Sequence, residues 1–439
     1  MSLKHTLAQL HIEQLSPMQQ EAYQAVKTTR KDVVVLSPTG SGKTLAYLLP
    51  LTERIDKDDD RVQAIVIVPG RELALQSAEV LRRMGTGLRA AACYGGRTAM
   101  EEHKMLKQTR PQIIFGTPGR LNDHIAKENF SVYGVSMVVI DEFDKCLEMG
   151  FHDEMSRLLK SLPGVKRRIL LSATDADEIP GYIRLDQAVK VDYTGEAGQV
   201  PGQIALYELR SDKKDKLETL GQLLRTLGQT QSIVFLNYRD SVERVADWLR
   251  GEGFGVSSFH GGMDQQARED ALYKFSNGSA NVFVSTDLGS RGLDIPGVNN
   301  IIHYHLPLNE DGYIHRVGRT GRWDACGQAF FILGPDEHKP DFINAELKPF
   351  TLPDVIPPTP RPTMGTLYIG KGKKDKISKG DILGFLCKAG GLKASDIGRI
   401  DVKDRYAYAA VDSKKIAAVL QNTRGEKIKG IRTVVEPVR

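Results

Sequence analysis

A glycine-rich segment at residues 37–44 has the residue types of a phosphate-binding loop. Its sequence is Ser-Pro-Thr-Gly-Ser-Gly-Lys-Thr, and it lies between apolar runs at residues 33–36 and 45–49, which predicts a strand, a loop and a helix in that order. Glycines let successive backbone N–H groups surround an anion, and the N-terminus of the next helix attracts negative charge. A Gly/Ser-rich turn with a solvated lysine is the alternative. The expected phosphate-binding residues are Ser37, which replaces the first glycine of the general pattern, and Thr39, Gly40, Ser41, Gly42, Lys43 and Thr44, with Lys43 on the outer phosphates and Thr44 on Mg²⁺.

A cluster of acidic residues follows another apolar run, at residues 137–140. A carboxylate at the end of a buried strand, beside a phosphate loop, is well placed to hold Mg²⁺ through water, and Asp141 has that position. Glu142 would orient or deprotonate the attacking water. The alternative is an acidic helix N-terminus, which is common in proteins.

Two further segments could support phosphate chemistry. Ser172-Ala173-Thr174 follows a predicted strand at residues 169–171, although a Ser/Thr turn alone indicates no more than a helix cap. Arg316, Arg319 and Arg322 are spaced three apart, so on a helix they would share one face and could neutralise charge on a γ-phosphate. A solvated basic helix is the alternative, but the two glycines among them would destabilise an ordinary surface helix.

The elements that must position these residues are short apolar runs alternating with helical patterns. The 439-residue chain is too long for one compact core, so two or three domains are expected. Predicted buried strands lie at 33–36, 64–68, 112–115, 137–140 and 169–171, and again at 232–235, 256–259, 281–285, 300–303 and 328–333. This pattern predicts two α/β domains, each a parallel sheet with helices on both faces.

Weaker patterns separate the domains. Residues 175–202 have little periodicity and end in several glycines, which indicates a flexible linker, and a proline-rich run at 353–362 indicates a semi-rigid spacer. We divide the chain into a first domain (1–195), a linker (196–206), a second domain (207–340), a proline-rich linker (341–362) and a C-terminal module (363–439). In the module we expect strands at 366–369, 397–402, 406–411 and 433–435 and helices at 381–388 and 415–422.

Charge is concentrated in the C-terminal module. It has 17 Lys and Arg against 8 Asp and Glu, a net of +9, so the rest of the chain carries −4 of the total of +5. A basic module on a mildly acidic body suggests a nucleic-acid-binding appendage, although a merely solvated basic surface is nearly as compatible with charge alone. No apolar stretch is long enough to predict a membrane span, and the N-terminus has no apolar signal core. The four scattered cysteines, without a Cys-x-x-Cys pair, fit a reducing cytoplasm.

Together, and in this order, the phosphate loop, the Asp-Glu-x-Asp cluster, Ser-Ala-Thr and His-Arg-x-Gly-Arg-Thr-Gly-Arg resemble the DEAD-box RNA helicases. The resemblance spans about residues 15–335. It extends to segments 69–74, 95–96, 117–120, 260–268 and 286–294, which resemble RNA-contact and ribose-contact motifs of that family.

The resemblance implies two RecA-like domains that use ATP and Mg²⁺ and bind single-stranded RNA, with closure around both ligands opening a duplex locally. Because ATP and RNA both favour the closed state, their affinities must be coupled. By this resemblance Glu142 acts on water, Arg319 and Arg322 are arginine fingers, Gln19 recognises adenine, Asp294 contacts ribose, and Ser172, Thr174 and His315 couple the sites. The implied RNA contacts are Pro69, Arg71, Gly96, Thr117, Gly119, Arg120, Gly261, Gln265, Arg268 and Thr286.

The chain departs from the family pattern at three places. Phe143 replaces the usual alanine, and a bulky ring there could alter coupling. Gly70 replaces a usual threonine and so removes a hydroxyl that could contact RNA phosphate. The aromatic residue usually found well upstream of Gln19 is missing.

The C-terminal module resembles the RNA-binding domain of DbpA-type helicases at residues 366–369, 372–377, 380–384 and 396–400. The resemblance implies an RRM-like fold that binds a hairpin of 23S rRNA in the peptidyl-transferase region. Most of the usual aromatic platform is not evident, so simple base stacking is not expected. Phosphate contacts are expected from Lys371, Lys373, Lys374, Lys376 and Lys379, and sequence readout would fall to residues such as Arg399, Lys403, Arg405 and Tyr406.

These observations lead to one leading hypothesis and two alternatives. The leading hypothesis is a cytoplasmic, monomeric, ATP-dependent RNA helicase that acts on 23S rRNA in particles preceding the large ribosomal subunit. The first alternative is an RNA-binding, ATP-gated clamp with weak catalysis, because Phe143 would disturb coupling. The second is a helicase directed to DNA.

Overall fold

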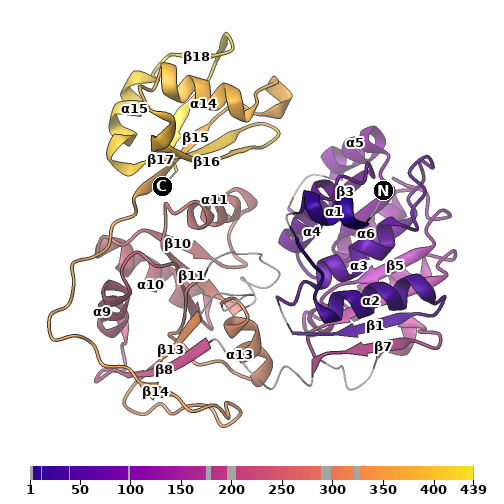
Figure 1. Ribbon diagram of the computed structural model, residues 1–439, viewed down its shortest axis with the longest axis horizontal. Coiled ribbons are helices and arrows are strands. Elements are labelled where there is room, and N and C mark those ends of the chain that lie inside the picture. The colour runs from indigo at the N-terminus through magenta and orange to yellow at the C-terminus, as the bar shows by residue number, and fades with distance from the viewer. Residues whose placement is uncertain are drawn as a thin grey trace. The chain divides into compact units, whose positions relative to one another are not determined.

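The computed structural model describes residues 3–10, 12–38, 40–96, 99–174, 179–194, 204–287, 298–320 and 327–438. Near residue 202 the chain divides into two compact units (Figure 1). The C-terminal module belongs to the second unit.

The first unit contains a parallel sheet of seven strands in the order β3-β4-β2-β5-β6-β1-β7. Its strands are β1 (Val33–Leu36), β2 (Ala64–Ile67), β3 (Ala90–Cys93), β4 (Ile113–Gly116), β5 (Met137–Ile140), β6 (Arg167–Ser172) and β7 (Val189–Asp192). Its helices are α1 (Leu3–Gln9), α2 (Pro17–Thr28), α3 (Lys43–Thr52), α4 (Arg71–Arg83), α5 (Ala99–Thr109), α6 (Pro118–Ala126), α7 (Phe143–Glu148) and α8 (His152–Lys160), with a 3₁₀ turn η1 (Gly181–Ile183). Helices lie on both sides of the sheet in Figure 1.

Strand β1 shows why this sheet needs two helical layers. Its side chains alternate between the faces of the sheet, and all four residues are buried. Val33 and Val35 pack with apolar residues of α2, α3 and α4, whereas Val34 and Leu36 pack with residues of α5, α6 and α8. A strand buried on both faces is typical of a doubly wound parallel sheet, so the predicted fold class is confirmed for this domain.

Two strands of the first sheet escaped prediction. β3 consists of three alanines and a cysteine, which have little β-propensity. β7 is a short strand at the sheet edge with alternating polar residues, and it pairs with β1. The interpretation of residues 175–202 as linker was therefore wrong at residues 181–192, where η1 and β7 belong to the first domain.

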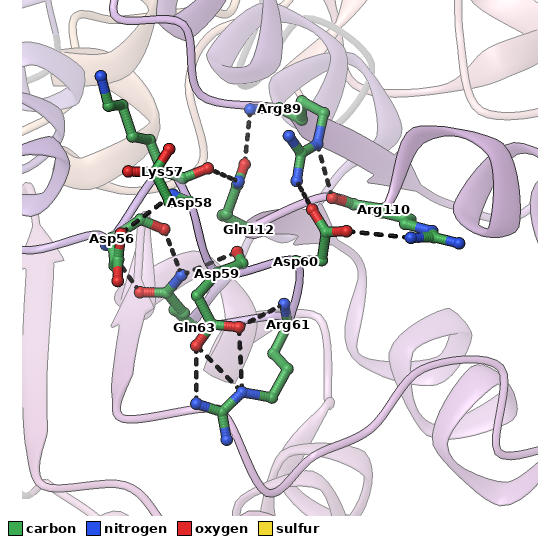
Figure 2. Close-up of polar contacts among 10 residues, drawn as sticks. All are labelled: Asp56, Lys57, Asp58, Asp59, Asp60, Arg61, Gln63, Arg89, Arg110 and Gln112. Atoms are coloured by element: carbon green, nitrogen blue, oxygen red, sulfur yellow. Dashed lines mark hydrogen bonds and ion pairs between the residues drawn. The ribbon is translucent and has the colours of Figure 1, made fainter.

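The acidic loop before β2, at residues 56–61, is held by polar contacts at the amino-terminal ends of the strands of the same sheet (Figure 2). Asp60 accepts hydrogen bonds from Arg89 (2.6 Å) and Arg110 (3.0 Å), which precede β3 and β4. The buried Gln112 amide accepts from the Arg89 backbone N–H and donates to the Lys57 carbonyl, both at 2.8 Å. These contacts lie at the amino-terminal ends of the strands, whereas the phosphate loop lies at their carboxyl ends.

The second unit contains another sheet of seven parallel strands, in the order β10-β11-β9-β12-β13-β8-β14. Its strands are β8 (Ile204–Arg210), β9 (Ser232–Leu236), β10 (Val256–Phe259), β11 (Val282–Thr286), β12 (Asn300–His303), β13 (Gly327–Leu333) and β14 (Lys348–Pro349). Its helices are α9 (Leu217–Leu227), α10 (Arg239–Gly251), α11 (Gln265–Ser276) and α13 (Glu310–Val317). The five predicted strands are confirmed, while β8 begins within the segment predicted as linker 196–206 and β14 was not expected.

The C-terminal module is a small antiparallel sheet covered by helices, as expected. Its strand order is β16-β17-β15-β20, from β15 (Met364–Ile369), β16 (Ile397–Val402), β17 (Ala407–Asp412) and β20 (Val435–Pro437). The helices α14 (Lys379–Lys388) and α15 (Ile416–Asn422) pack on one face, and a short hairpin joins β18 (Lys427–Ile428) to β19 (Ile431–Arg432). In the described part of the chain, no helix has both the length and the apolar character needed to span a membrane.

Candidate functional site

The predicted phosphate-binding residues gather at the carboxyl edge of the first sheet. The phosphate loop follows β1, Asp141 follows β5, and Ser172 ends β6. These three strands are neighbours in the sheet, in the order β5-β6-β1. Because parallel strands end at the same edge, tertiary pairing places side by side residues that are far apart in sequence.

The phosphate loop has the backbone that an anion requires. Gly40 and Gly42 both have φ +85°, a left-handed conformation that strongly favours glycine. Helix α3 starts directly after Gly42 and has no side-chain cap, so its N-terminal N–H groups are not used by a capping side chain. Among the described residues, the Ser41 hydroxyl is buried and has no hydrogen-bond partner. A loop with these features fits a bound phosphate.

Lys43 is folded back onto its own loop. Its buried ammonium donates hydrogen bonds to the carbonyls of Ser37 (2.6 Å) and Pro38 (3.0 Å). A phosphate oxygen would compete with these two carbonyls for the same ammonium.

Gln19 connects α2 to the phosphate loop. Its side-chain oxygen accepts from the Ser16 backbone N–H (3.0 Å), and its amide nitrogen donates to the Gly42 carbonyl (3.1 Å). Together with the hydrogen bond from its own backbone N–H to the Ser16 hydroxyl, this is a capping box that starts α2. The buried Gln19 therefore touches the loop itself, and recognition of adenine by this residue stays a prediction.

Asp141 and Glu142 form an acidic pair with unusual backbone geometry. Asp141 is buried, and its Oδ1 accepts from the Glu142 backbone N–H at 3.0 Å. Burial, followed by the nearby Glu142 charge, raises the pKa of Asp141 to about 7. Glu142 itself has φ +50° at the start of α7, a conformation that is costly for a residue with a side chain and is concentrated at functional sites. The hard oxygen ligands of Asp141 and Thr44 suit Mg²⁺, which would also relieve the buried negative charge.

A chain of contacts links the acidic segment to the Ser-Ala-Thr segment. The Thr174 hydroxyl donates to Asp144 Oδ2 (3.4 Å), and the Ser172 hydroxyl donates to the Thr174 carbonyl (2.6 Å). The Phe143 ring is buried in the apolar cluster on the α6 and α8 side of the sheet. Phe143 is therefore a core residue of the first domain.

The predicted RNA contacts of the first domain occupy the other half of the same edge. They follow β2, β3 and β4, which adjoin one another in the order β3-β4-β2. Gly96 lies so close to Arg71 that an added Cβ would meet the guanidinium at 2.7 Å. Thr117 precedes α6 as its N-cap, and Gly119 is exposed in the first turn. The sheet order thus separates phosphate-loop residues from the set Pro69, Arg71, Gly96, Thr117, Gly119 and Arg120.

A buried carboxylate holds Arg120 in this half of the edge. Glu102 lies 3.4 Å from Arg120 Nε, accepts from the Tyr94 backbone N–H (3.0 Å) and pairs with His124 Nε2 (2.8 Å). The other His124 ring nitrogen bonds the Asn129 amide at 2.8 Å. The sequence analysis missed Glu102 and His124 because nothing in their spacing connects α5 to α6.

In the second unit the corresponding edge follows β10 and β11. Gly261 lies between β10 and α11, Gln265 begins α11 and donates to Glu269 (3.0 Å), and Thr286 ends β11. Arg268 is buried, with its guanidinium 4.5 Å from the centre of the Phe259 ring. Arg268 is therefore a packing residue here, and an RNA contact by it stays a prediction.

The arginine segment differs from the predicted helical stripe. Helix α13 ends at Val317, and the Gly318 N–H closes its last turn on the Ile314 carbonyl, so Arg319 lies in the following turn. The expectation that Arg316 and Arg319 share one helix face was wrong, because α13 ends at Val317, between them. His315 and Arg319 are both buried.

Arg316 holds the second domain together. It forms a bidentate pair with Asp287 (2.5 and 2.8 Å) and donates to Asn237 Oδ1 (2.8 Å) and the His305 carbonyl (2.6 Å). Its side chain is buried. Such a fully bonded guanidinium is an organising element of the fold, and the finger roles of Arg319 and Arg322 stay predictions.

Exposed residues at this edge were missed by sequence reasoning. Tyr238 and Arg239 follow β9, and Tyr238 is 65% exposed. The Arg239 guanidinium approaches Gly261 and Gly262. Their signal was their position directly after a predicted buried strand, the same signal that identified Asp141.

The lysine-rich loop of the C-terminal module is largely exposed, and RNA contact by it stays a prediction. Lys373, Lys374, Lys376 and Lys379 are exposed, and Lys371 pairs with Asp375 at 3.1 Å. The β18–β19 hairpin adjoins it, because Lys429 Nζ donates to the Lys376 carbonyl (3.2 Å) and pairs with Asp381 (2.9 Å). The exposed residues Lys427, Lys429 and Arg432 thus extend the basic surface beyond the predicted run. Three other predicted site residues, Thr39, Asp294 and Arg322, lie outside the described residues.

Family models match three successive parts of the chain. The DEAD/DEAH box helicase model matches residues 16–179, the helicase conserved C-terminal domain model matches residues 215–324, and the DbpA RNA-binding domain model matches residues 366–437.

Individual proteins match over most of the chain. The ATP-dependent RNA helicase DbpA of Escherichia coli (strain K12) is 35% identical over 430 residues, which cover 95% of this chain and 93% of that protein. DbpA of Bacillus subtilis (strain 168) is 32% identical over 91% of this chain and 90% of that protein. Among solved structures, S. cerevisiae Dbp5 bound to RNA and ADP BeF3 has a TM-score of 0.70 at 26% identity and covers 80% of this chain and 94% of that one.

Proposed function

This chain belongs to the DEAD-box ATP-dependent RNA helicases, of the DbpA type, and on that premise we propose that it opens short RNA duplexes in 23S rRNA during assembly of the large ribosomal subunit. The observation that carries the proposal is the division of one sheet edge into a half with the phosphate loop and a half with Arg71, Arg120 and the exposed Gly119. In the proposed working form the protein is a cytoplasmic monomer, with the domains 1–195, 207–340 and 363–439 joined by linkers at 196–206 and 341–362.

We assign the chemistry to residues of the first domain. The loop backbone and Lys43 bind the phosphates of ATP, while Thr44 and Asp141 hold Mg²⁺, in the case of Asp141 through water. When bound, Mg²⁺ supplies positive charge that stabilises the phosphates undergoing transfer. Glu142 orients and deprotonates the attacking water. The left-handed backbone of Glu142 supports this assignment, because strain of that kind persists where the surrounding structure imposes it.

We assign coupling and completion of the site to a second group of residues. Ser172 and Thr174 transmit the state of the acidic segment, which is supported by the hydrogen bond from Thr174 to Asp144. Arg319 and Arg322 serve as the fingers and His315 as a coupling residue, whereas Arg316 is excluded from this role by its partners. RNA is contacted by the residues that follow β2, β3, β4, β10 and β11 and by the lysine loop of the module.

RNA-stimulated phosphate release from the full-length protein tests the function. With saturating ATP, we expect a 23S rRNA fragment that contains the peptidyl-transferase hairpin to stimulate turnover far more than an unrelated hairpin of equal length. The Glu142→Gln variant serves as the catalytic blank. No stimulation by any RNA would favour the clamp with weak catalysis, and equal stimulation by a matched DNA strand would favour a DNA-directed enzyme. Equal stimulation by both hairpins would reject the 23S rRNA assignment while leaving the helicase family intact.

A further inference from the structure

The central strand β17 of the C-terminal module, and part of its neighbour β15, are buried on both faces of the sheet. Leu367, Ala407 and Ala409 point toward α14 and α15 and form the core of the module. Side chains alternate along a strand, so Thr366 and Tyr408 point to the other face. They are nevertheless only 3% and 0% exposed. Another part of the chain must therefore cover this second face.

The covering element is α11, in the helicase domain of the same unit. The rings of Tyr273 and Tyr408 stack with their centres 4.6 Å apart. The Tyr408 hydroxyl donates to Asp270 and accepts from Gln266 Nε2 at 2.6 Å. The Tyr406 hydroxyl donates to Glu269 Oε2 at 2.5 Å. Hydrogen bonds to carboxylates are among the stronger ones in proteins, and burial raises the pKa of both tyrosine hydroxyls.

The contact continues beyond the tyrosines. Asn277 Nδ2 donates to the Thr366 hydroxyl, which in turn donates to the Ser279 hydroxyl, both at 2.9 Å. The Tyr273 hydroxyl donates to the Arg399 carbonyl at 2.5 Å. The α11 positions involved are 266, 269, 270 and 273, which lie three or four residues apart along one face of the helix, and Asn277 follows as its C-cap. A stripe of this length indicates a packed interface and not a single isolated contact.

The linker that precedes the module is also fastened to the helicase domain. Arg225 Nε donates to the Thr359 hydroxyl at 3.0 Å, and Gln229 Nε2 donates to the Arg361 carbonyl at 2.5 Å. The proline-rich segment thus follows the surface of the second domain up to the start of β15. Linker and sheet face together give the module two separate attachments.

This arrangement changes how the module can bind RNA. Tyr368, Tyr406 and Tyr408 form an aromatic cluster, with ring centres 5.2–6.3 Å apart. However, α11 covers it and places Glu269 and Asp270 against it, whose charges repel phosphate. The exposed lysines of the 371–379 loop and the β18–β19 hairpin remain open to solvent.

We propose that the tyrosine face of the C-terminal module is a docking surface for α11 in the same chain, so that module and second helicase domain move as one body and RNA binds the module at its lysine loop. The docking does not depend on the proposed function, whereas its consequence for RNA rests on it. A docked module would hold its RNA at a fixed place relative to Gly261 and Thr286 in the same unit.

A distance measurement between spin labels in the full-length chain tests the docking. Labels are placed at Lys388→Cys in α14 and Lys214→Cys in the helicase domain, both exposed, after Cys326 and Cys387 are replaced by serine. We expect one narrow distance distribution. Asp270→Arg, which alters only the helicase side, and Tyr408→Ala should both broaden it by on the order of 10–20 Å, the reach of a released linker of this length. Tyr238→Ala, an exposed tyrosine outside the interface, is the matched control and should leave it narrow.

A broad distribution in the unaltered chain, or narrow distributions in both variants, would overturn the docking. This measurement needs neither ATP nor RNA, so it stands even if the proposed helicase function fails. In a second arm, Asp270→Arg should bind the 23S rRNA hairpin within about threefold of the unaltered chain, since its lysine loop is intact. A loss of tenfold or more would show that the docked arrangement itself contributes to RNA binding and would contradict the assignment of RNA to the lysine loop alone.

Discussion

The Lys43 ammonium donates a hydrogen bond of 2.6 Å to the carbonyl of Ser37, within its own loop. One charged group thus bonds its own loop and is also the group expected to bind the outer phosphates. Lys43→Ala removes both interactions. We expect ATP turnover to fall by about 100-fold or more, the scale of losing one preorganised electrostatic contact. Phosphate-release kinetics measure this, with the exposed Lys57→Ala as control; retained turnover in Lys43→Ala would reject the role.

Glu142→Gln separates binding from hydrolysis. The amide keeps the size of the side chain but cannot accept a proton, so we expect nucleotide and RNA affinities to persist while turnover falls by roughly 10²–10⁴-fold. Fluorescent-nucleotide titration and single-turnover hydrolysis are measured on the same sample. Glu148→Gln, at the end of the same helix, is the matched control. If Glu142→Gln hydrolysed ATP at an unchanged rate, Glu142 would not be the general base.

Arg316 and Arg319 should respond differently to the same substitution. Arg316→Lys loses the bidentate contact with Asp287 and leaves buried acceptors unpaired, so we expect a loss of about 2–4 kcal/mol in unfolding free energy. Arg319→Lys should lower turnover by roughly 10²-fold or more with a smaller effect on stability, because the finger role needs guanidinium geometry. Denaturant unfolding measures the stability of both variants, and ATPase assays measure their turnover. A stable but inactive Arg316→Lys together with an unstable but active Arg319→Lys would exchange the two assignments.

Because of His303, the stability of the second unit should depend on pH. Burial, and then the Arg316 charge, hold the pKa of His303 well below its ordinary range, and its ring stacks on Phe331 at 4.2 Å. The unfolded chain takes up a proton below about pH 6.5 that the folded chain refuses, so stability falls as the pH drops, by up to about 1.4 kcal/mol per pH unit. His303→Phe should flatten this slope between pH 6.5 and 5, measured by thermal unfolding. The exposed His338→Gln should leave it unchanged, and parallel slopes for all three proteins would reject the assignment.

The lysine loop should set the salt dependence of RNA binding. Replacing Lys373, Lys374 and Lys376 by alanine removes up to three phosphate contacts, each worth about 0.7–0.9 in the slope of log affinity against log salt. We therefore expect a slope lower by roughly 2 for a structured RNA, measured by fluorescence anisotropy at several salt concentrations. Lys388→Ala with Lys414→Ala removes exposed lysines outside the loop and is the control. Equal slopes would mean that RNA binds another surface.

Much of the architecture could be predicted because buried parallel strands are continuous apolar runs. That signal located β1, β5 and β9 to within one residue, and it located Asp141 and the phosphate loop as the residues that follow them. β3 and β7 were missed because three alanines and an edge strand with alternating polar residues have weak patterns. Resemblance supplied roles for Ser172 and Arg319 that their residue types alone could not.

Local chemistry could be read from the chain alone: glycines where φ must be positive, acids and hydroxyls at strand ends, and lysines in an exposed loop. Which of these groups meet became clear only from the folded protein. Arg316 and Arg319 look alike in sequence, yet Gly318 ends the helix between them and Asp287 bonds the first. Tyr408 points away from the core of the module, yet α11 covers it. The physical reason is that pairing and docking depend on contacts between distant segments, which only the folded chain brings within bonding distance.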